Sequence, residues 1–376
     1  MSAASAGVKL RRSAHLAAYW KADRFTLRHV ITGVECAADA AVLAVLERAG
    51  GPTARSELRA ATQGAGDALI DRLLAAGLLV ASGDSAPGDG AQDGWRGWSP
   101  EAALFHFGTK DYPFRQRPSD ELTVIGPQRP PDPLKQDPPG VTRIELPPFP
   151  RRGPIPETLL QRRTWRRFAH RPLQLPELAT LAGLTWAVQR WSPGLQDVRL
   201  AFKTSPSGGA KHSIEAYVAA ARVDGLAPAT YHYCPDRHGL ARVAELPSRE
   251  QLAAFLPAQP FYAEAAAVFF MTSVFGRVQA KYRFARAYRV VQIEAGHLAQ
   301  TFCLLATWLR LAPFCTAALG DTAIERHLGI DGVGESVLYV TGVGVRPEGV
   351  DWAPFGDGRE APETTSPSYR ERDPHV

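Results

Sequence analysis

Cysteine is scarce in this sequence, and long apolar segments are missing. Only four of the 376 residues are cysteines, and none of them stand in a CxxC spacing, which argues against a structural zinc site and against a disulfide framework. The longest apolar run, around residues 265–275, is far shorter than the roughly 20 residues that a membrane helix needs. The N-terminus is positively charged but lacks the continuous apolar region of a signal peptide. We therefore expect a cytoplasmic protein with no membrane partner.

A strong charge of one sign is also missing. The formal net charge is +5, and much of the excess is arginine in residues 11–28 and 151–171. Binding of a nucleic-acid backbone needs a dense basic stripe, so we expect no nucleic-acid partner. A local arginine cluster can instead hold one anionic ligand. With 45% hydrophobic and 22% charged residues, the composition is that of a globular protein, and the length favours two or three domains.

Composition divides the chain into four parts. Residues 8–83 predict three helices and a β-hairpin, a small winged-helix-like recognition domain in which Thr53 caps the second helix. Residues 84–154 predict a flexible linker and a proline-rich arm, extended and unable to form a helix, although "EAALFHFGTKDYPF" is apolar enough to be ordered. Residues 155–350 alternate helix and strand patterns, which indicates an α+β domain. The polar tail at 355–376 is expected to be disordered.

The role of the N-terminal unit stays open at this point. Its third helix carries Arg72 against Asp67 and Asp71, which weakens the interpretation as a DNA-binding regulator. Recognition of a peptide or protein and a purely structural role are the alternatives.

Two motifs have residue types that suit an anionic or flat ligand. "QRRTWRRFAHRPL" (161–173) combines five arginines with a threonine, as binding of a phosphate monoester requires. "FKTSPSGGAKHSIEAYVAA" (202–220) places Gly208 and Gly209 where the backbone can approach a ligand closely. It is neither a Walker loop nor a GxGxxG turn. A solvated basic loop and a tight connection are the alternative readings.

Two further motifs lie in the C-terminal half. In "AKYRFARAYRVVQIEAGHLAQTF" (280–302), Glu294 and His297 have the spacing of di-iron sites, but a second copy is missing, so we expect no metal and a buried Glu–His pair that supports the helix or a dimer contact. Lys281 and Tyr282 precede this long helix and can project into a cleft. The strand "SVLYVTGVG" contains two glycines suited to close packing and leads to Arg346, which could reach a phosphate.

Together and in this order, the four motifs resemble the nitroreductase-like flavoprotein superfamily. Within it they resemble the SagB-type dehydrogenases, whose characterised members oxidise azolines in thiazole/oxazole-modified peptides. "RRTWRRF" is similar to the family's RRSxRxF, with Thr164 for the usual serine, and "SPSGGAKHSIEAY" resembles its PSGGAxHxxExY element. "KYRFARAYR…EAGHLAQTF" is similar to KYxxRxYR…EAGHxxQ, with one extra residue after the Lys-Tyr pair. The resemblance is strong for residues 160–345 and implies a central mixed sheet with flanking helices that binds FMN.

The resemblance also implies roles for individual residues. The FMN phosphate and ribityl chain would be held by Arg162, Arg163, Thr164 and Arg166, with Arg346 as a closing contact. The isoalloxazine would lie against Ser205, Pro206, Ser207 and Gly208, and the loop 315–319, with Ala317, Ala318 and Leu319, would offer a backbone N–H to flavin N5. Lys281 and Tyr282 match the pair held to be catalytic. Two subunits would form a homodimer and share two flavin sites.

The implied reaction, azoline to azole, removes a hydride and a proton from adjacent carbons. FMN takes the hydride and a base takes the proton. Unperturbed lysine and tyrosine side chains titrate near ~10.4 and ~10, so Arg283, Arg286 or the other member of the pair would have to lower one pKa.

The implied function is therefore FMN-dependent oxidation of an azoline or related substrate in natural-product biosynthesis. The substrate would be a peptide, a carrier-bound group or a small molecule, and a cyclodehydratase or another biosynthetic enzyme would be a partner. The alternatives are a desaturase acting on a carrier-bound or small metabolite and a flavin-free scaffold of a peptide-modifying complex. Either oxygen or a nicotinamide cofactor could turn over the flavin.

Overall fold

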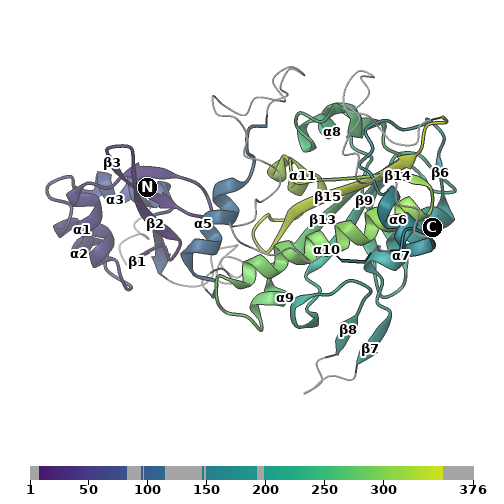
Figure 1. Ribbon diagram of the computed structural model, residues 1–376. Coiled ribbons are helices and arrows are strands. Elements are labelled where there is room, and N and C mark those ends of the chain that lie inside the picture. Colours follow the sequence, from purple (N-terminus) through teal and green to yellow (C-terminus); the bar gives the residue numbers. More distant parts are fainter. Residues whose placement is uncertain are drawn as a thin grey trace, which may run out of the picture.

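The computed structural model describes residues 8–82, 95, 97–114, 146–147, 150–192 and 199–349 (Figure 1). The predictions for the linker at 84–94, for the central part of the proline-rich arm and for the tail at 355–376 concern residues outside these ranges. No helix in the described part of the chain is both long enough and apolar enough to cross a membrane.

The N-terminal residues form three helices, a strand pair and a small sheet. The predicted hairpin is the antiparallel pair of β2 (Leu16–Lys21) and β3 (Arg24–His29), which β4 (Glu35–Ala37) extends. Strands β1 (Lys9–Arg12) and β5 (Leu79–Ser82) also pair antiparallel. The helices are α1 (Ala40–Arg48), α2 (Arg55–Ala60) and α3 (Gly66–Ala75). Leucines and valines from all three helices fill one core, as the apolar spacing predicts.

The helix starts in this unit differ from one another. Asp39 caps α1, because its carboxylate accepts a hydrogen bond from Val42 N at 2.8 Å. The prediction that Thr53 caps α2 is wrong. Its hydroxyl instead donates to the carbonyls of Arg48 and Gly51, at 3.0 and 2.9 Å, and so holds the turn between the two helices.

The centre of the molecule is a six-stranded sheet in the order β12-β11-β9-β13-β15-β14. All five neighbouring pairs are antiparallel, so the expected mixture of strand directions is not found within this sheet; a parallel pairing occurs between the short strands β6 and β10. The α+β class itself is confirmed. The strands are β9 (Ile214–Ala220), β11 (Ala229–Cys234), β12 (Gly239–Ala244), β13 (Ala267–Val274), β14 (Leu311–Thr316) and β15 (Glu335–Val345).

Helices cover both faces of this sheet (Figure 1). Successive residues of a strand point to opposite faces, so Val218 and Phe269 pack under α7 (Leu175–Trp186) and α10 (Ala287–Trp308). Tyr217 and Phe270 pack under α8 (Arg249–Phe255) and α11 (Asp321–Leu328). The long apolar run in the sequence is therefore β13, a strand buried on both faces.

Two helices lie outside this two-sided arrangement. Helix α5 (Ser99–Thr109) connects the N-terminal unit to the sheet domain, and its ordering was predicted from its apolar residues. Helix α6 (Pro154–Gln161) packs against α10 and corrects the prediction that this proline-rich stretch is extended. Proline is tolerated in the first turn of a helix, where its missing N–H would have no intrahelical partner.

The remaining elements are short and connect the larger ones. They are β6 (Leu173–Gln174), β7 (Arg190–Ser192), β8 (Leu200–Phe202), β10 (Val223–Asp224), α9 (Phe275–Gln279) and the 3₁₀ helices η3 (Gly208–Ala210) and η4 (Pro260–Glu264).

Candidate functional site

The predicted catalytic pair lies beside the glycine loop. Lys281 and Tyr282 follow helix α9, and both backbone amides donate to Val278 O, at 3.1 and 2.9 Å. A Cβ atom added at Gly209 would lie 2.6 Å from Tyr282 Oη and 2.8 Å from Lys281 Nζ. Gly209 also has a φ of 62°, a conformation that favours glycine. The structure thus brings together two motifs that are distant in sequence, and the glycine leaves room for both polar side-chain ends.

Helix α10 fixes the position of the glycine loop. Glu294 is 2% exposed and accepts hydrogen bonds from Ser207 Oγ at 2.7 Å and from Ser213 Oγ at 3.3 Å. A backbone amide of β9 donates to its other oxygen at 3.3 Å. These donors offset the cost of burying a carboxylate. At Gly208 the loop is so close to the helix that a Cβ atom would lie 2.3 Å from Val290 Cγ1.

The start of the loop also lies along α10. Ser205 Oγ is 2.7 Å from Thr301 Oγ1, and His297 Nδ1 is 3.1 Å from Pro206 O. The expected buried Glu–His pair is therefore only half correct. Glu294 is buried, whereas His297 is exposed and contacts the loop backbone. Both residues support the loop. Glu294 and His297 are about one turn apart on α10, so they contact neighbouring residues of the loop that runs beside the helix, Ser207 and Pro206.

The arginine-rich segment 162–168 runs along the other end of the sheet. Trp165 N donates to Pro313 O of β14 at 2.9 Å, and the ring of Phe168 lies over β15. A Cβ atom at Gly344 would be only 2.6 Å from Phe168 Cδ1, and one at Gly342 only 2.1 Å from an atom of the Phe314 ring. The prediction that the glycines of this strand serve close packing is confirmed.

Arg162 lies near the loop 315–319. Its side chain is partly buried and makes no ion pair or hydrogen bond with any residue in the described ranges. A hydrogen bond with Cys303 lowers the pKa of the Cys315 thiol, and the charge of Arg162 acts in the same direction. The guanidinium is thus available to an anion that approaches this loop.

The other arginines predicted to hold the phosphate have protein partners. Arg163 Nη1 donates to the carbonyls of Leu160 and Arg162, both at 2.8 Å, and so terminates helix α6. Arg346 donates from Nε to Leu311 O at 2.8 Å and from Nη2 to Thr307 O at 3.3 Å. Thr164 and Arg166 are partly buried, and the guanidinium of Arg166 lies 5.7 Å from the centre of the Phe261 ring.

The predicted N5-binding loop is held by Gln259. Its amide donates to Ala318 O at 3.0 Å, and Thr316 Oγ1 donates back to Gln259 Oε1 at 2.8 Å. The amide of Ala318 already donates to Thr316 Oγ1 at 3.1 Å. Ala317 is exposed and Leu319 is buried in the second core. The backbone amides of Ala317 and Leu319 are therefore the better donors for a ligand.

The predicted site residues form two groups along α10. The glycine-loop group comprises residues 205–209 with Lys281 and Tyr282, and the arginine group comprises residues 162–166 and 315–319 with Arg346. Gly208 contacts α10 at Val290, and Arg346 contacts it at Thr307. These helix positions are about 25 Å apart, since each residue adds ~1.5 Å. Ser205, at the start of the loop, contacts α10 at Thr301, so within one chain it is the Gly208 end of the glycine-loop group that lies far from Arg346 along the helix.

Sequence reasoning missed the contact that the residues flanking α5 make with Tyr282 of the predicted catalytic pair. Trp98 is 0% exposed, and its Nε1 donates to Tyr282 O at 2.8 Å. Nearby, Trp95 Nε1 donates to Val333 O at 2.8 Å, and His106 Nδ1 lies 2.8 Å from Tyr288 Oη. The two tryptophans, spaced three residues apart just before "FHFGTKD", were the available signal.

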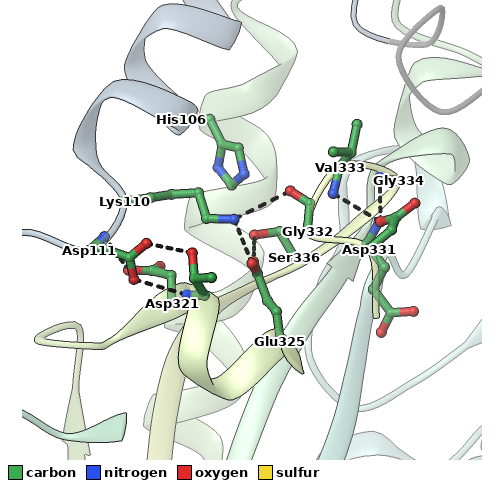
Figure 2. A network of polar contacts seen from close by, with 12 residues as sticks. His106, Lys110, Asp111, Asp321, Glu325, Asp331, Gly332, Val333, Gly334 and Ser336 are labelled. Atoms are coloured by element: carbon green, nitrogen blue, oxygen red, sulfur yellow. Dashed lines mark hydrogen bonds and ion pairs between the residues drawn. The ribbon is translucent and has the colours of Figure 1, made fainter. Parts of the chain in front are cut away.

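A polar network continues this junction toward α11 (Figure 2). Lys110 Nζ lies 2.6 Å from Glu325 Oε2, and Glu325 is also bonded to Ser336 at the start of β15. Asp111 accepts from Thr322 N at 2.9 Å, and its own amide donates to Asp321 Oδ2 at 3.0 Å. The segment around α5 is therefore anchored at both ends, by tryptophans beside Tyr282 and by charges beside α11.

Comparison with known proteins gives a consistent set of matches. A model of the nitroreductase family matches residues 159–345. "Putative nitroreductase MJ1384" of Methanocaldococcus jannaschii is 32% identical over 176 residues, which is 47% of this chain and 84% of that protein. The trifolitoxin-processing protein TfxB of Rhizobium leguminosarum bv. trifolii is 31% identical over 144 residues, covering 36% of this chain and 38% of TfxB.

Among solved structures, one chain of the E. coli microcin synthetase McbBCD complex with truncated pro-MccB17 is 18% identical. The structural alignment covers 71% of this chain and 100% of the McbBCD chain, with a TM-score of 0.48. The matched family region spans residues from the second half of α6 to the end of β15. All predicted site residues except Arg346 lie inside it, and the α5 segment lies before it.

Proposed function

The chain belongs to the nitroreductase family, and from this premise we propose that it is an FMN-dependent oxidoreductase that dehydrogenates an azoline or a related peptide-derived or amino-acid-derived substrate. Family membership agrees with the resemblance to nitroreductase-like flavoproteins that the motifs indicated. The similarity to a trifolitoxin-processing protein supports the narrower resemblance to SagB-type dehydrogenases. The observation that carries the proposal is that Lys281 Nζ and Tyr282 Oη both lie next to Gly209 of the glycine loop.

The residues present fit FMN. A phosphate needs a cation without a competing partner, and Arg162 supplies one beside the loop 315–319. A flat ring system needs backbone without side chains, and Gly208 and Gly209 supply that. When bound, FMN would supply the hydride acceptor. The backbone amides of Ala317 and Leu319 would donate to it, and Thr164 and Arg166 would hold its phosphate and ribityl chain.

The role of the catalytic pair follows from its geometry. Dehydrogenation of an azoline removes a proton from the carbon next to the one that loses hydride, so a base must stand beside the ring. Lys281 Nζ lies 5.2 Å from the centre of the Tyr282 ring, so the charge on one group is felt by the other. One side chain would take the proton, and its neighbour would balance the resulting charge. The backbone contacts of α9 and Trp98 hold both in place.

A homodimer is part of the proposal. Ile155 and Leu159 on α6 and Trp308 on α10 are exposed by 73, 51 and 53%, and they surround a wholly apolar hollow of about 250 Å³. Exposed apolar clusters of this kind mark interaction sites. A second copy of the chain would cover this surface and place its Lys281 and Tyr282 near the arginine group of the first. Within one chain, the α10 contacts of Gly208 and Arg346 are ~25 Å apart.

The first experiment is a visible absorption spectrum of the purified protein, followed by heat release and identification of the chromophore. We expect a flavin spectrum and released FMN. The protein is then incubated with an azoline-containing peptide, with and without a cyclodehydratase, and the loss of two hydrogen atoms is followed by mass spectrometry. Lys281→Ala and Tyr282→Phe should keep the flavin and lose oxidation. A protein that stays colourless with added FMN, or leaves every azoline peptide unchanged, would refute the proposal.

Mixed dimers test whether the site is shared. Arg162→Ala subunits and Lys281→Ala subunits, each expected to be inactive alone, are co-expressed with different affinity tags. If each site combines the arginine group of one subunit with the glycine-loop group of its partner, purified heterodimers regain about half of the wild-type activity, because one of two symmetric sites is intact. Heterodimers without activity would place both groups in one subunit's own site.

A further inference from the structure

A cavity of about 400 Å³ adjoins the proposed catalytic pair. Ala210 and Ala280 line it, and these residues are the chain neighbours of Gly209 and Lys281. The rest of the wall comes from β7, β8, the beginning of β9 and α9. A ligand in this cavity would therefore lie next to the proposed site of proton transfer.

Basic side chains dominate the wall of the cavity. The lining includes four cationic residues and one carboxylate, namely Arg199, Lys203, Lys211, Arg277 and Glu215. Both oxygens of Glu215 are already in use, because one accepts from Arg277 and the other lies 2.7 Å from His232 Nε2. Glu215 and Arg277 therefore compensate each other. The charge that remains on the wall is positive.

Lys203 is a partly buried cation of this lining without a partner in the described chain. It makes no hydrogen bond or ion pair with any residue of the described chain. Burial lowers the pKa of Lys203, against the opposing effect of Glu215 and Glu294. A partly buried ammonium without a hydrogen-bonding partner is costly. The site is thus complete only when an anionic acceptor is present.

The lining also contains apolar side chains. Val188, Trp191 and Pro235 are among them, and the guanidinium of Arg199 lies 4.5 Å from the centre of the Trp191 ring. Burial lowers the pKa of His212 to about 4, so its ring is neutral at physiological pH and adds a hydrogen-bonding group rather than a charge. A lining that combines basic and apolar side chains suits an organic anion better than a hydrated inorganic ion, because the apolar surface gains only from contact with carbon atoms.

We propose that this cavity binds a carboxylate of the substrate, attached to the reacting ring or to the residue that directly follows it, and that Lys203 pairs with it. The inference rests on the proposed function for the identity of the ring, and its binding test does not depend on catalysis. A carboxylate held here would fix the ring carbon that loses its proton beside Lys281 and Tyr282. Lys203 contacts the substrate, whereas the chemistry belongs to the catalytic pair.

The binding test uses three stable thiazole peptides of otherwise identical sequence. They end in thiazole-4-carboxylate, in thiazole-4-carboxamide, and in thiazole followed by an aspartate amide. Calorimetric titration of the flavin-loaded protein should show at least tenfold tighter binding of a carboxylate peptide than of the carboxamide, the effect of one charge-assisted hydrogen bond. The stronger of the two carboxylate ligands identifies the source of the anion.

Variants of Lys203 decide the assignment. Lys203→Met should reduce the preference for carboxylate to about one, and Lys203→Arg should keep most of it, since one loses and the other retains the charge. Lys9→Met is the matched control, because Lys9 is exposed on β1, far from the cavity in sequence and outside its wall. Equal affinity of wild-type protein for acid and amide, or an unchanged preference in Lys203→Met, would overturn the proposal.

Turnover of the corresponding thiazoline peptides separates this proposal from the proposed function. If the thiazoline peptides that end in carboxylate and in carboxamide are oxidised with equal kcat/KM, the cavity does not bind a substrate carboxylate, although the enzyme assignment stands. If no thiazoline is oxidised but the thiazole acid still binds through Lys203, the binding site stands and the reaction assignment falls.

Discussion

Replacement of Trp98 by phenylalanine tests whether the segment around α5 positions the catalytic pair. The change keeps an aromatic ring in a fully buried position but removes the Nε1–H that donates to Tyr282 O at 2.8 Å. Trp95→Phe is the matched control. It removes the same kind of bond from the neighbouring ring, whose acceptor is Val333 O at the same distance of 2.8 Å.

The expected costs in stability are similar for the two variants. Each leaves a carbonyl without its donor, about 1–3 kcal/mol, and each leaves a cavity where the larger indole was, which adds about 1 kcal/mol or more. The expected effects on catalysis differ. A displacement of the Tyr282 backbone of up to 1 Å can cost about 10²-fold in rate, so kcat for Trp98→Phe should fall ten- to a hundredfold. Trp95→Phe should stay within about twofold of wild type.

Two measurements check this prediction. Azoline oxidation is compared at a temperature where all three proteins are folded, and hydrogen exchange is followed at residues 280–286, a readout that does not need the enzymatic assignment. Trp98→Phe should accelerate exchange in this segment more than Trp95→Phe does. Equal losses of activity with equal exchange would refute the positioning role and leave both tryptophans as packing residues.

Three further predictions concern single positions. Gly209→Ala should abolish most azoline oxidation at a stability cost of about 1–3 kcal/mol, because its φ is positive and its Cβ would collide with Tyr282 Oη, whereas Gly51→Ala, which meets open space, should leave activity unchanged. Lys203→Met should keep or raise the Tm, since it removes a partly buried charge without a partner; a clear fall would contradict the ligand-binding role. Burial raises the pKa of Asp321 to about 6, so its protonation stabilises the folded state below that pH and the gain is lost as pH rises through about 6. The Tm of wild type relative to Asp321→Asn should therefore increase between pH 7.5 and pH 5, and a constant difference would exclude this carboxyl as the cause.

Much of the fold could be predicted from the sequence because its apolar patterns are strong. The long helix predicted after Lys281 and Tyr282 is found as α10. The apolar run at 265–275, used only to argue against a membrane helix, contains β13. The glycines of β15 were also interpreted correctly, because close packing is a local requirement that a glycine reveals. Thr53 was misjudged because a threonine can serve the preceding turn as readily as the following helix.

The candidate site could be predicted as a set of residues but not as an arrangement. Motif order indicated which side chains to consider, and the pairing of Gly209 with Lys281 and Tyr282 emerged only from the folded chain. The bond from Trp98 to Tyr282 joins residues 184 positions apart, and no local pattern carries such information. His297 has the helical spacing of a partner for Glu294, but it lies on the exposed side of the helix, where its ring contacts the loop backbone.

The anchoring of the α5 segment has a consequence for how this protein can be divided. A fragment that begins at the family boundary would keep every signature motif and lose the two tryptophans together with Lys110. It would uncover Phe275 and Tyr288, which pack on Trp98, and would leave Glu325 buried without its ammonium, a defect of about 3–5 kcal/mol. The smallest autonomous folding unit is therefore longer than the region that matches the family. Exchange of the N-terminal unit for another, in the laboratory or in evolution, has to join upstream of Trp95.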